Sequence, residues 1–284
     1  MTTTVTIPDR FRTEVLQHLI LSYINLPEEP LIMGIFGYPG EGKTFQLRTV
    51  LAQSAVEVYS VNAADLESDR AGAPGKLILE RYVTAAHRIG AGRPCALLID
   101  DVDTTIGEWS QNTGTVNHQQ VLAQLMHLAD HPTFIEKIGS VRRVPVFVTG
   151  NDPAKLYPPL RRPGRMGFLY WQPTDAEREA VLTSVFEGLL TAPEVARLMK
   201  SYAHRPVSFF AQVRGAVIRD VCATLVGSSA ANLAAVVDAP EKYASFVSAT
   251  MNSLGPDIAA RTEAQARKLD CGFDSADRAY LTGP

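Results

Sequence analysis

The feature that most constrains this chain is a glycine-rich segment placed directly after an apolar run. Residues 31–36 read as a buried strand, and residues 37–44 then match the pattern G-x-x-x-x-G-K-[ST]. The segment consists of Gly37, Tyr38, Pro39, Gly40, Glu41, Gly42, Lys43 and Thr44. Its glycines let the backbone curl so that N–H groups point at phosphate oxygens, and the following helix adds its positive end. The sequence therefore predicts a phosphate-binding loop between a strand and a helix.

Two side chains separate this prediction from a simple glycine-rich turn, which would need neither of them. We expect Lys43 to contact the β- and γ-phosphates of a nucleotide, and the Thr44 hydroxyl to hold Mg²⁺. Phe45 follows directly and completes the predicted nucleotide-binding segment, residues 37–45.

A pair of acidic residues ends a second apolar run. Residues 95–99 are apolar, and Asp100 and Asp101 follow them. Buried parallel strands deliver such carboxylates to the sheet edge where nucleotide phosphates bind. We expect Asp100 to act at the metal and Asp101 to polarise the attacking water. Alone, the pair would be better explained as an exposed strand end, but the phosphate loop favours the functional interpretation.

A third apolar run, residues 144–149, ends near an amide side chain. Asn151 follows this run by two residues. At a strand edge beside phosphates, an amide would hold the attacking water or detect the γ-phosphate without adding negative charge.

The order of these runs predicts an α/β domain. Strands are expected at 31–37, 56–62, 95–100, 144–149 and 168–171, and helices near 10–25, 43–53, 75–90, 117–130 and 153–160. Such alternation is typical of a parallel sheet covered on both faces. Beyond residue 173, two capping-box patterns, Thr174 with Glu177 and Thr191 with Glu194, predict four or five helices and no strand. We therefore expect a nucleotide-binding domain over 1–172, a helical domain over 173–270 and a loose tail over 271–284.

Composition argues against several other classes of protein. The 284 residues are 46% hydrophobic and 20% charged, which suffices for a large core. The net charge of −3 and a pI near 6.1 give no reason to expect a nucleic-acid partner. Cys95, Cys222 and Cys271 are too widely spaced to indicate a disulfide framework. With no run that is apolar enough to span a bilayer, we expect a cytoplasmic protein without a membrane partner.

Four strings of residues resemble the Rubisco activase family of AAA+ ATPases, in its cyanobacterial form. They are residues 67–78, residues 115–133, residues 148–152, and residues 156–166 with 170–173. The resemblance spans about 5–220 and weakens beyond residue 220. It implies a hexamer with an AAA+ α/β domain and an α-helical lid. It further implies that ATP and Mg²⁺ drive the release of inhibitory sugar phosphates from Rubisco, by action on its large subunit.

The resemblance also implies roles for particular residues. Asn151 corresponds to the sensor 1 residue, and Arg162 and Arg165 correspond to arginines that reach the ATP of the neighbouring subunit. Arg214 corresponds to the sensor 2 arginine of the lid.

Two glycine-bearing stretches, 67–75 and 107–117, correspond to the pore loops of the family. The residues expected to contact the substrate there are Ser68, Asp69, Arg70, Trp109 and Ser110. For Trp109, packing within its own loop remains an alternative.

Some residues depart from the family pattern. The acidic pair is Asp100 with Asp101 where Asp with Glu is usual, and Ala216 stands where a second lid arginine often occurs. The printed sequence holds neither a plant-type N-terminal extension nor a C-terminal module resembling the Rubisco small subunit, and whether such a docking module is missing stays open. Association with carboxysomes remains open, as do two alternative functions: an AAA+ remodeller of a different complex, and an adaptor that docks to its partner only when it holds nucleotide.

Overall fold

The computed structural model describes residues 5–62, 73–102, 116–228, 233–255 and 257–281. The chain forms two compact units, one over Ile7–Gln172 and the other from Pro173 onward, with Thr6 packed on the second. The residues predicted for the two pore loops, 68–70 and 109–110, lie outside the described residues.

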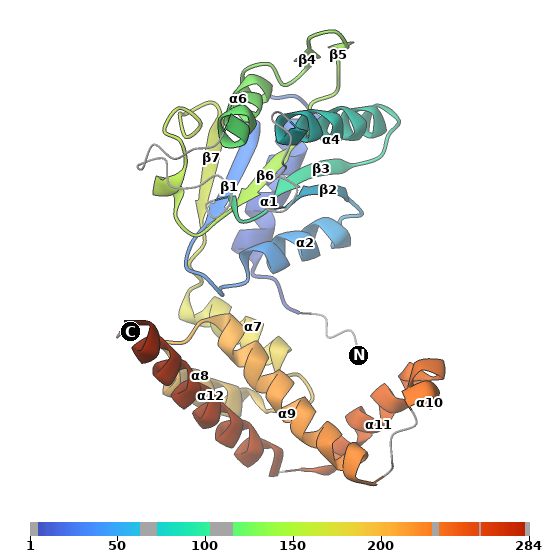
Figure 1. The fold of residues 1–284 in the computed structure, drawn as a ribbon, viewed down its shortest axis with the longest axis vertical. Coiled ribbons are helices and arrows are strands. Elements are labelled where there is room, and N and C mark those ends of the chain that lie inside the picture. The colour runs from blue at the N-terminus through green and yellow to red at the C-terminus, as the bar shows by residue number, and fades with distance from the viewer. Residues whose placement is uncertain (1–4, 63–72, 103–115, 229–232, 256, 282–284) are drawn as a thin grey trace. The chain divides into compact units, whose positions relative to one another are not determined.

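The first unit is built on a parallel sheet of five strands in the order β2-β3-β6-β1-β7 (Figure 1). The strands are β1 (Ile32–Phe36), β2 (Glu57–Val61), β3 (Cys95–Ile99), β6 (Val146–Thr149) and β7 (Met166–Tyr170). All five predicted strands are confirmed, with ends shifted by at most two residues. The three central strands, β3, β6 and β1, are buried along their whole length, which explains why they read as unbroken apolar runs.

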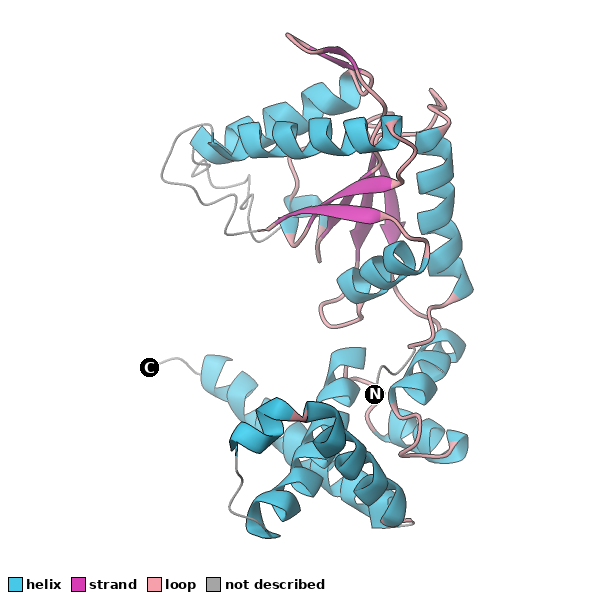
Figure 2. Cartoon of the chain, turned by 90° about the vertical axis from the view of Figure 1, so that its right-hand side faces the viewer, coloured by secondary structure: helices cyan, strands magenta, loops and turns pink. Residues whose placement is uncertain are grey.

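Helices cover both faces of this sheet (Figure 2). They are α1 (Asp9–Tyr23), α2 (Lys43–Gln53), α4 (Ala73–Gly90) and α6 (Val116–Asp130). Side chains alternate along each strand, so Met33 and Ile35 of β1 pack with α1 and α2, whereas Ile32 and Phe36 pack with α4 and α6. These two layers of buried side chains, one on each face, hold the sheet between the helices and fix the positions of its strand ends.

The helix predicted over 153–160 is wrong. The structure has only a short 3-10 helix, η2 (Pro153–Lys155), capped by the Asp152 side chain, which accepts from the Ala154 N–H. Two prolines, Pro158 and Pro159, follow. A residue before proline is pushed out of the helical region, and proline offers no N–H to a helix. The chain after η2 therefore continues as turns.

A small antiparallel hairpin was not predicted. It joins β4 (Phe134–Ile135) to β5 (Gly139–Ser140) at the end of α6 (Figure 1). Lys137 in its turn and Gly139 at the start of β5 have positive φ angles of 70° and 95°. Each strand has two residues, too few for alternation of apolar and polar residues to be visible in the sequence.

The second unit consists of helices joined by turns, with no strand among its described residues. Its helices are α7 (Asp175–Val185), α8 (Ala192–Ser201), α9 (Val207–Ser228), α10 (Leu233–Asp238), α11 (Pro240–Ser253) and α12 (Asp257–Leu281). Both predicted capping boxes are present, and Glu177 and Glu194 accept the N–H groups of Thr174 and Thr191 at 2.8 Å. The described helices number six, where four or five were predicted, and α12 continues through 271–281, the segment predicted as a loose tail.

The core of this unit lies along α9. Phe209, Phe210, Val213 and Val217 are buried there against α7, α8, α11 and α12. Among the described residues, no helix of either unit has the length and apolar character that crossing a membrane requires.

Candidate nucleotide and magnesium site

The predicted phosphate loop connects the end of β1 to the start of α2. Gly37, Gly40 and Gly42 have φ angles of +148°, +79° and +77°, which residues with a side chain rarely adopt. Gly42 is the N-cap of α2 and has no side chain to accept a hydrogen bond from the first-turn N–H groups. The helix start is therefore suited to binding an anion, because its N–H groups and dipole favour negative charge.

The loop is held from behind by Trp171, the residue after β7. Trp171 is fully buried, and its indole N–H donates to the carbonyl of Glu41 at 3.2 Å. A Cβ atom added at Gly37 would stand 2.1 Å from the Trp171 carbonyl oxygen. The Gln46 side chain of α2 donates to the same Glu41 carbonyl at 3.2 Å. These contacts fix the loop between β7 and α2.

Lys43 lies at the centre of the loop and is 7% exposed. Its ammonium group donates to the carbonyls of Gly37 and Tyr38 at 2.8 and 3.0 Å, and to Oδ1 of Asn151 at 3.0 Å. Each of these acceptors is neutral, so the cation is held by dipoles that a phosphate group would displace. The contact also brings Asn151, which follows β6, to the phosphate loop, and its expected role toward the attacking water stays a prediction.

Asp100 and Thr44 meet between β3 and α2. The Thr44 hydroxyl donates to Oδ1 of Asp100 at 2.7 Å, and the Thr149 hydroxyl donates to the same oxygen. Arg48 approaches the other carboxylate oxygen of Asp100 at 3.5 Å. The pairing of Ile99 with Val148 in the sheet explains this arrangement, because it brings Asp100 beside Thr149.

Thr44 and Asp100 fit a magnesium ion in their chemistry. Mg²⁺ prefers oxygen ligands and is held in phosphate sites by one or two protein oxygens together with substrate phosphates. No group of three or more His, Cys, Asp or Glu side chains in the described part of the chain would hold a metal by itself. The fit is therefore to a metal that enters with a nucleotide, held by the Thr44 hydroxyl and the Asp100 carboxylate.

Asp101 is exposed at the same sheet edge and has a φ angle of +49°. Its backbone N–H donates to the Thr149 hydroxyl at 3.1 Å. Asp is one of the few residues that adopt this left-handed conformation readily. The predicted catalytic carboxylate thus follows directly on the carboxylate that contacts Thr44.

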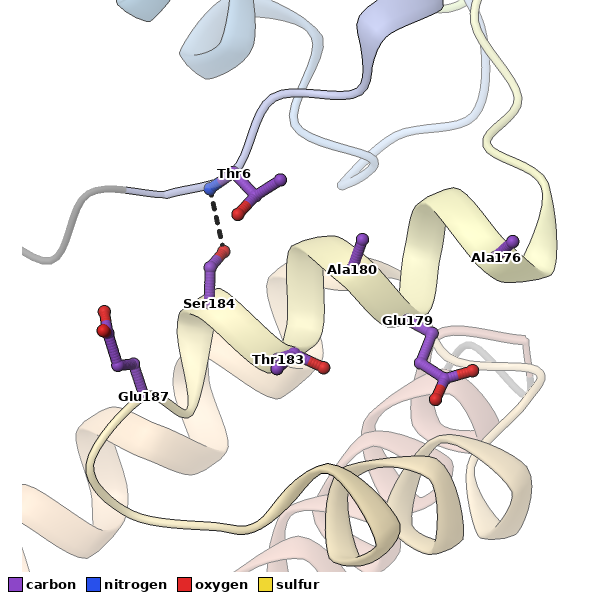
Figure 3. Close-up of a pocket in the computed structure, with 7 residues that line it drawn as sticks. All are labelled: Thr6, Ala176, Glu179, Ala180, Thr183, Ser184 and Glu187. Atoms are coloured by element: carbon purple, nitrogen blue, oxygen red, sulfur yellow. Dashed lines mark hydrogen bonds between the residues drawn. The ribbon is translucent and has the colours of Figure 1, made fainter.

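A surface depression in the helical unit is a poor alternative to this site. It is lined along α7 by alanine, threonine, serine and glutamate side chains (Figure 3). The Thr6 N–H donates to the Ser184 hydroxyl there at 2.9 Å. The charged side chains in its lining, Glu179 and Glu187, are both acidic, which disfavours a phosphate ligand.

Comparison with known proteins agrees with this geometry. The family model "ATPase family associated with various cellular activities (AAA)" matches residues 33–174, which make up half of the chain and include the phosphate loop, both acidic residues and Asn151. The chain belongs to the AAA family.

Among individual proteins, this AAA chain is similar to Rubisco activases. The chloroplastic ribulose bisphosphate carboxylase/oxygenase activase of Spinacia oleracea is 39% identical over 219 residues, which are 74% of this chain and 46% of the relative. The activases of Anabaena sp. and Nostoc sp. are 39% and 38% identical, and cover 74% of this chain and 53% of their own length. The resemblance inferred from the motifs is confirmed, and the chain spans about half the length of these relatives.

The two arginines expected to act on a neighbouring subunit differ in their surroundings. Arg162 is exposed, whereas Arg165 forms a two-pronged ion pair with Asp130, at 2.7 Å from Nε to Oδ1 and 2.6 Å from Nη2 to Oδ2. Arg165 also donates to the Pro159 carbonyl at 2.9 Å. Asp130 is the last residue of α6, so this pair ties the turn after η2 to α6.

Arg214, the expected lid arginine of this AAA protein, lies on α9 and is partly exposed. It follows the buried Val213 in the sequence and belongs to the helical unit. Its expected role at the nucleotide, like those of Arg162 and Arg165, stays a prediction.

Sequence reasoning missed two residues that support the site. Trp171 appeared only as part of a family string, although a tryptophan at the end of a strand needs a partner for its N–H when buried. Thr149 read as the polar end of an apolar run, and its contact with Asp100 depends on strand order, which the sequence does not display.

The ion pair of Arg165 with Asp130 generates a prediction about pH. The hydrogen bond from Arg165 lowers the pKa of Asp130 from its ordinary value of 3.8. A carboxylate with a lowered folded-state pKa stabilises the fold above its unfolded-state pKa, and this stabilisation is lost as the pH falls through the folded-state pKa. Asp130→Asn should therefore reduce the free energy of unfolding at about pH 7 and make little difference at about pH 2.

The effect should be at most about 1 kcal/mol, because both side chains are partly exposed to solvent. Denaturant unfolding of wild type, Asp130→Asn, Arg165→Gln and the double variant isolates the coupling between the two residues. A coupling energy that does not change between the two pH values would contradict this account of the pair.

Proposed function

We propose that this protein is an ATP-hydrolysing AAA+ remodeller that reactivates Rubisco by releasing inhibitory sugar phosphates from closed active sites. The observation that carries the proposal is the similarity to Rubisco activases over 74% of the chain, combined with one sheet edge that gathers Lys43, Thr44, Asp100 and Asn151. ATP with Mg²⁺ is the proposed cofactor.

Each site residue has a separate role in phosphoryl transfer in this proposal. Lys43 would bind the β- and γ-phosphates and offset their charge. Thr44 and Asp100 would hold Mg²⁺, which would supply positive charge beside the phosphates. Asp101 accepts the proton of the attacking water, and Asn151 orients this water without adding negative charge. Asn151 accepts a hydrogen bond from Lys43, so it is well placed to respond when a γ-phosphate takes that hydrogen bond.

The remaining positive charge comes from a second subunit in this proposal. Arg162 and Arg165 follow the turns after η2, and Arg165 is already engaged by Asp130 of its own chain. Delivery to the ATP of a neighbour would couple hydrolysis to the interface of a homo-oligomer, for which the family suggests a hexamer. Arg214 would report the nucleotide state to the lid.

The proposed macromolecular partner is the Rubisco large subunit. The stretches 67–75 and 107–117, with Asp69, Arg70 and Trp109, would grip an extended segment of it within a central pore by transient contacts. We propose a cytoplasmic location, where association with carboxysomes would bring the protein to its substrate.

Different roles for Lys43 and Asp101 generate the next prediction. Lys43→Ala should weaken ATP binding by roughly 10-fold to 100-fold, the loss expected when hydrogen bonds to a charged group are removed. Asp101→Asn should bind ATP with near-normal affinity and hydrolyse it slowly, because it lacks the base but keeps the phosphate contacts. Binding by calorimetry and turnover by phosphate release separate the two effects.

Lys200→Ala in α8 is the matched control, since it removes a lysine in the other unit. Near-normal turnover in both site variants would refute the assignment. An adaptor that only binds nucleotide would instead show no steady turnover in the wild-type protein.

Action of the arginines across the interface is tested by mixing variants. Arg165→Ala should retain ATP affinity and lose hydrolysis by roughly 10³-fold, the usual loss for a missing arginine finger. Mixing it with Lys43→Ala subunits should restore part of the turnover, because some interfaces then combine an intact phosphate loop with an intact arginine. If intact mixed oligomers never recover activity, the arginines do not act in trans.

The activity itself is tested with Rubisco inhibited by bound ribulose bisphosphate. The protein with ATP and Mg²⁺ should restore carboxylation, and the Lys43→Ala variant should not. Trp109→Ala and Arg70→Ala should keep ATP turnover but restore less Rubisco for each ATP consumed. ATP turnover without any recovery of carboxylation would instead favour an AAA+ remodeller of a different complex.

A further inference from the structure

We propose that Thr149 is a positioning residue of the phosphate site, and that its hydroxyl sets the Asp100 carboxylate against Thr44 and holds the backbone of Asp101. The inference rests on the proposed function, because it assigns this hydroxyl a role in how the site receives Mg²⁺ with a nucleotide. None of the sequence motifs described above gives Thr149 such a role.

Both hydrogen-bonding capacities of the Thr149 hydroxyl are used at the site. Thr149 is the last residue of β6 and is fully buried. Its hydroxyl donates to Oδ1 of Asp100 and accepts the N–H of Asp101 at 3.1 Å. A hydroxyl has one hydrogen and two lone pairs, so a single buried side chain fixes both a carboxylate and the peptide group that follows it.

The bond to Asp100 competes with another partner of that carboxylate. Arg48 faces the second oxygen of Asp100 at 3.5 Å, and its side chain is 44% exposed. Without the Thr149 hydroxyl, the carboxylate would keep one hydroxyl partner, Thr44, and would turn more easily toward the exposed guanidinium of Arg48. Buried Thr149 thus holds Asp100 in the orientation that a cation between Thr44 and Asp100 requires.

The same hydroxyl leaves Thr44 free to bind a cation. The Thr44 and Thr149 oxygens are 3.4 Å apart, which is long for a hydroxyl pair, and Thr44 donates its hydrogen to Asp100 at 2.7 Å. Because Thr149 donates its hydrogen to Asp100 and not to Thr44, the Thr44 oxygen keeps its lone pairs for Mg²⁺.

The bond from Asp101 has a separate consequence. The φ angle of +49° at Asp101 lies in the left-handed region, which Asp adopts more readily than most residues but less readily than glycine, and a fixed acceptor for its N–H helps to hold it there. Loss of the hydroxyl should release this backbone and, with it, the position of the catalytic carboxylate. A residue that only packed the end of β6 would have neither effect.

The test compares Thr149→Val, which removes the hydroxyl and keeps the branched shape, with Thr149→Ser, which keeps the hydroxyl. The readout is the Mg²⁺ concentration that gives half-maximal enhancement of binding of the fluorescent nucleotide mant-ADP. We expect Thr149→Val to raise this concentration by roughly 10-fold to 100-fold, as for other residues that orient a metal ligand. Thr149→Ser should stay within about threefold of wild type, and Mg²⁺-free affinity should be unchanged in both.

Thr84→Val is the matched control, because it removes a hydroxyl that only bonds within α4. Amide exchange of the nucleotide-free protein is the second measurement, and Thr149→Val should speed exchange at Asp101. Thr149→Cys should behave like the valine variant, because a thiol is a poor hydrogen-bond donor. The cysteine variant therefore provides the same test if the valine variant does not fold.

An unchanged Mg²⁺ requirement in Thr149→Val, or an equal defect in Thr149→Ser, would overturn the inference. Wild-type protein that binds mant-ADP without any effect of Mg²⁺ would contradict the proposed function instead. In that case the exchange rate at Asp101 alone decides the role of Thr149, and an unchanged rate in the valine variant would refute it.

Discussion

The hydrogen bond from Thr44 to Asp100 is the contact on which the rest of the site depends, because it joins the start of α2 to the end of β3. The strand that leads into α2 is β1, and it is not a neighbour of β3 in the sheet, since β6 lies between them. The contact therefore exists only if the strands pair in register, with Ile99 beside Val148 and Ile35 beside Thr149. The buried side chains on both faces of the sheet hold the strands in this register. They therefore determine the distance between the Thr44 hydroxyl and the Asp100 carboxylate.

The phosphate loop is supported by residues at the end of β7, the edge strand beside β1. Trp171 follows the edge strand β7 and donates to the loop carbonyl of Glu41, while its own carbonyl leaves room only for glycine at position 37. Arg10 stacks over the Trp171 ring at 4.7 Å, and Phe11 meets it edge-on at 4.9 Å, so α1 completes the support. The loop that would bind phosphate is thus held by Trp171 at the end of β7, and α1 holds Trp171 in turn.

The sequence was sufficient for what depends on local pattern and insufficient for what depends on strand order. Lys43, Thr44 and Asp100 could be predicted because a glycine-rich loop and an acidic strand end are contiguous in the chain, and the strands were visible as apolar runs. The helix over 153–160 was wrong because the paired prolines Pro158 and Pro159 disfavour helical backbone before them and remove two helix donors. The role of Thr149 and the pairing of Arg165 with Asp130 could not be predicted, because each joins segments that only the fold brings together.

The central claim is that the loop after β1 and the ends of β3 and β6 form one nucleotide and magnesium site. Hydrogen exchange of the wild-type protein with and without ATP and Mg²⁺ tests it most directly. The account predicts that peptides covering 37–44, 99–102 and 148–151 become protected together, while the middle of α4 does not change. Protection of the phosphate loop without any change at the ends of β3 and β6 would contradict it.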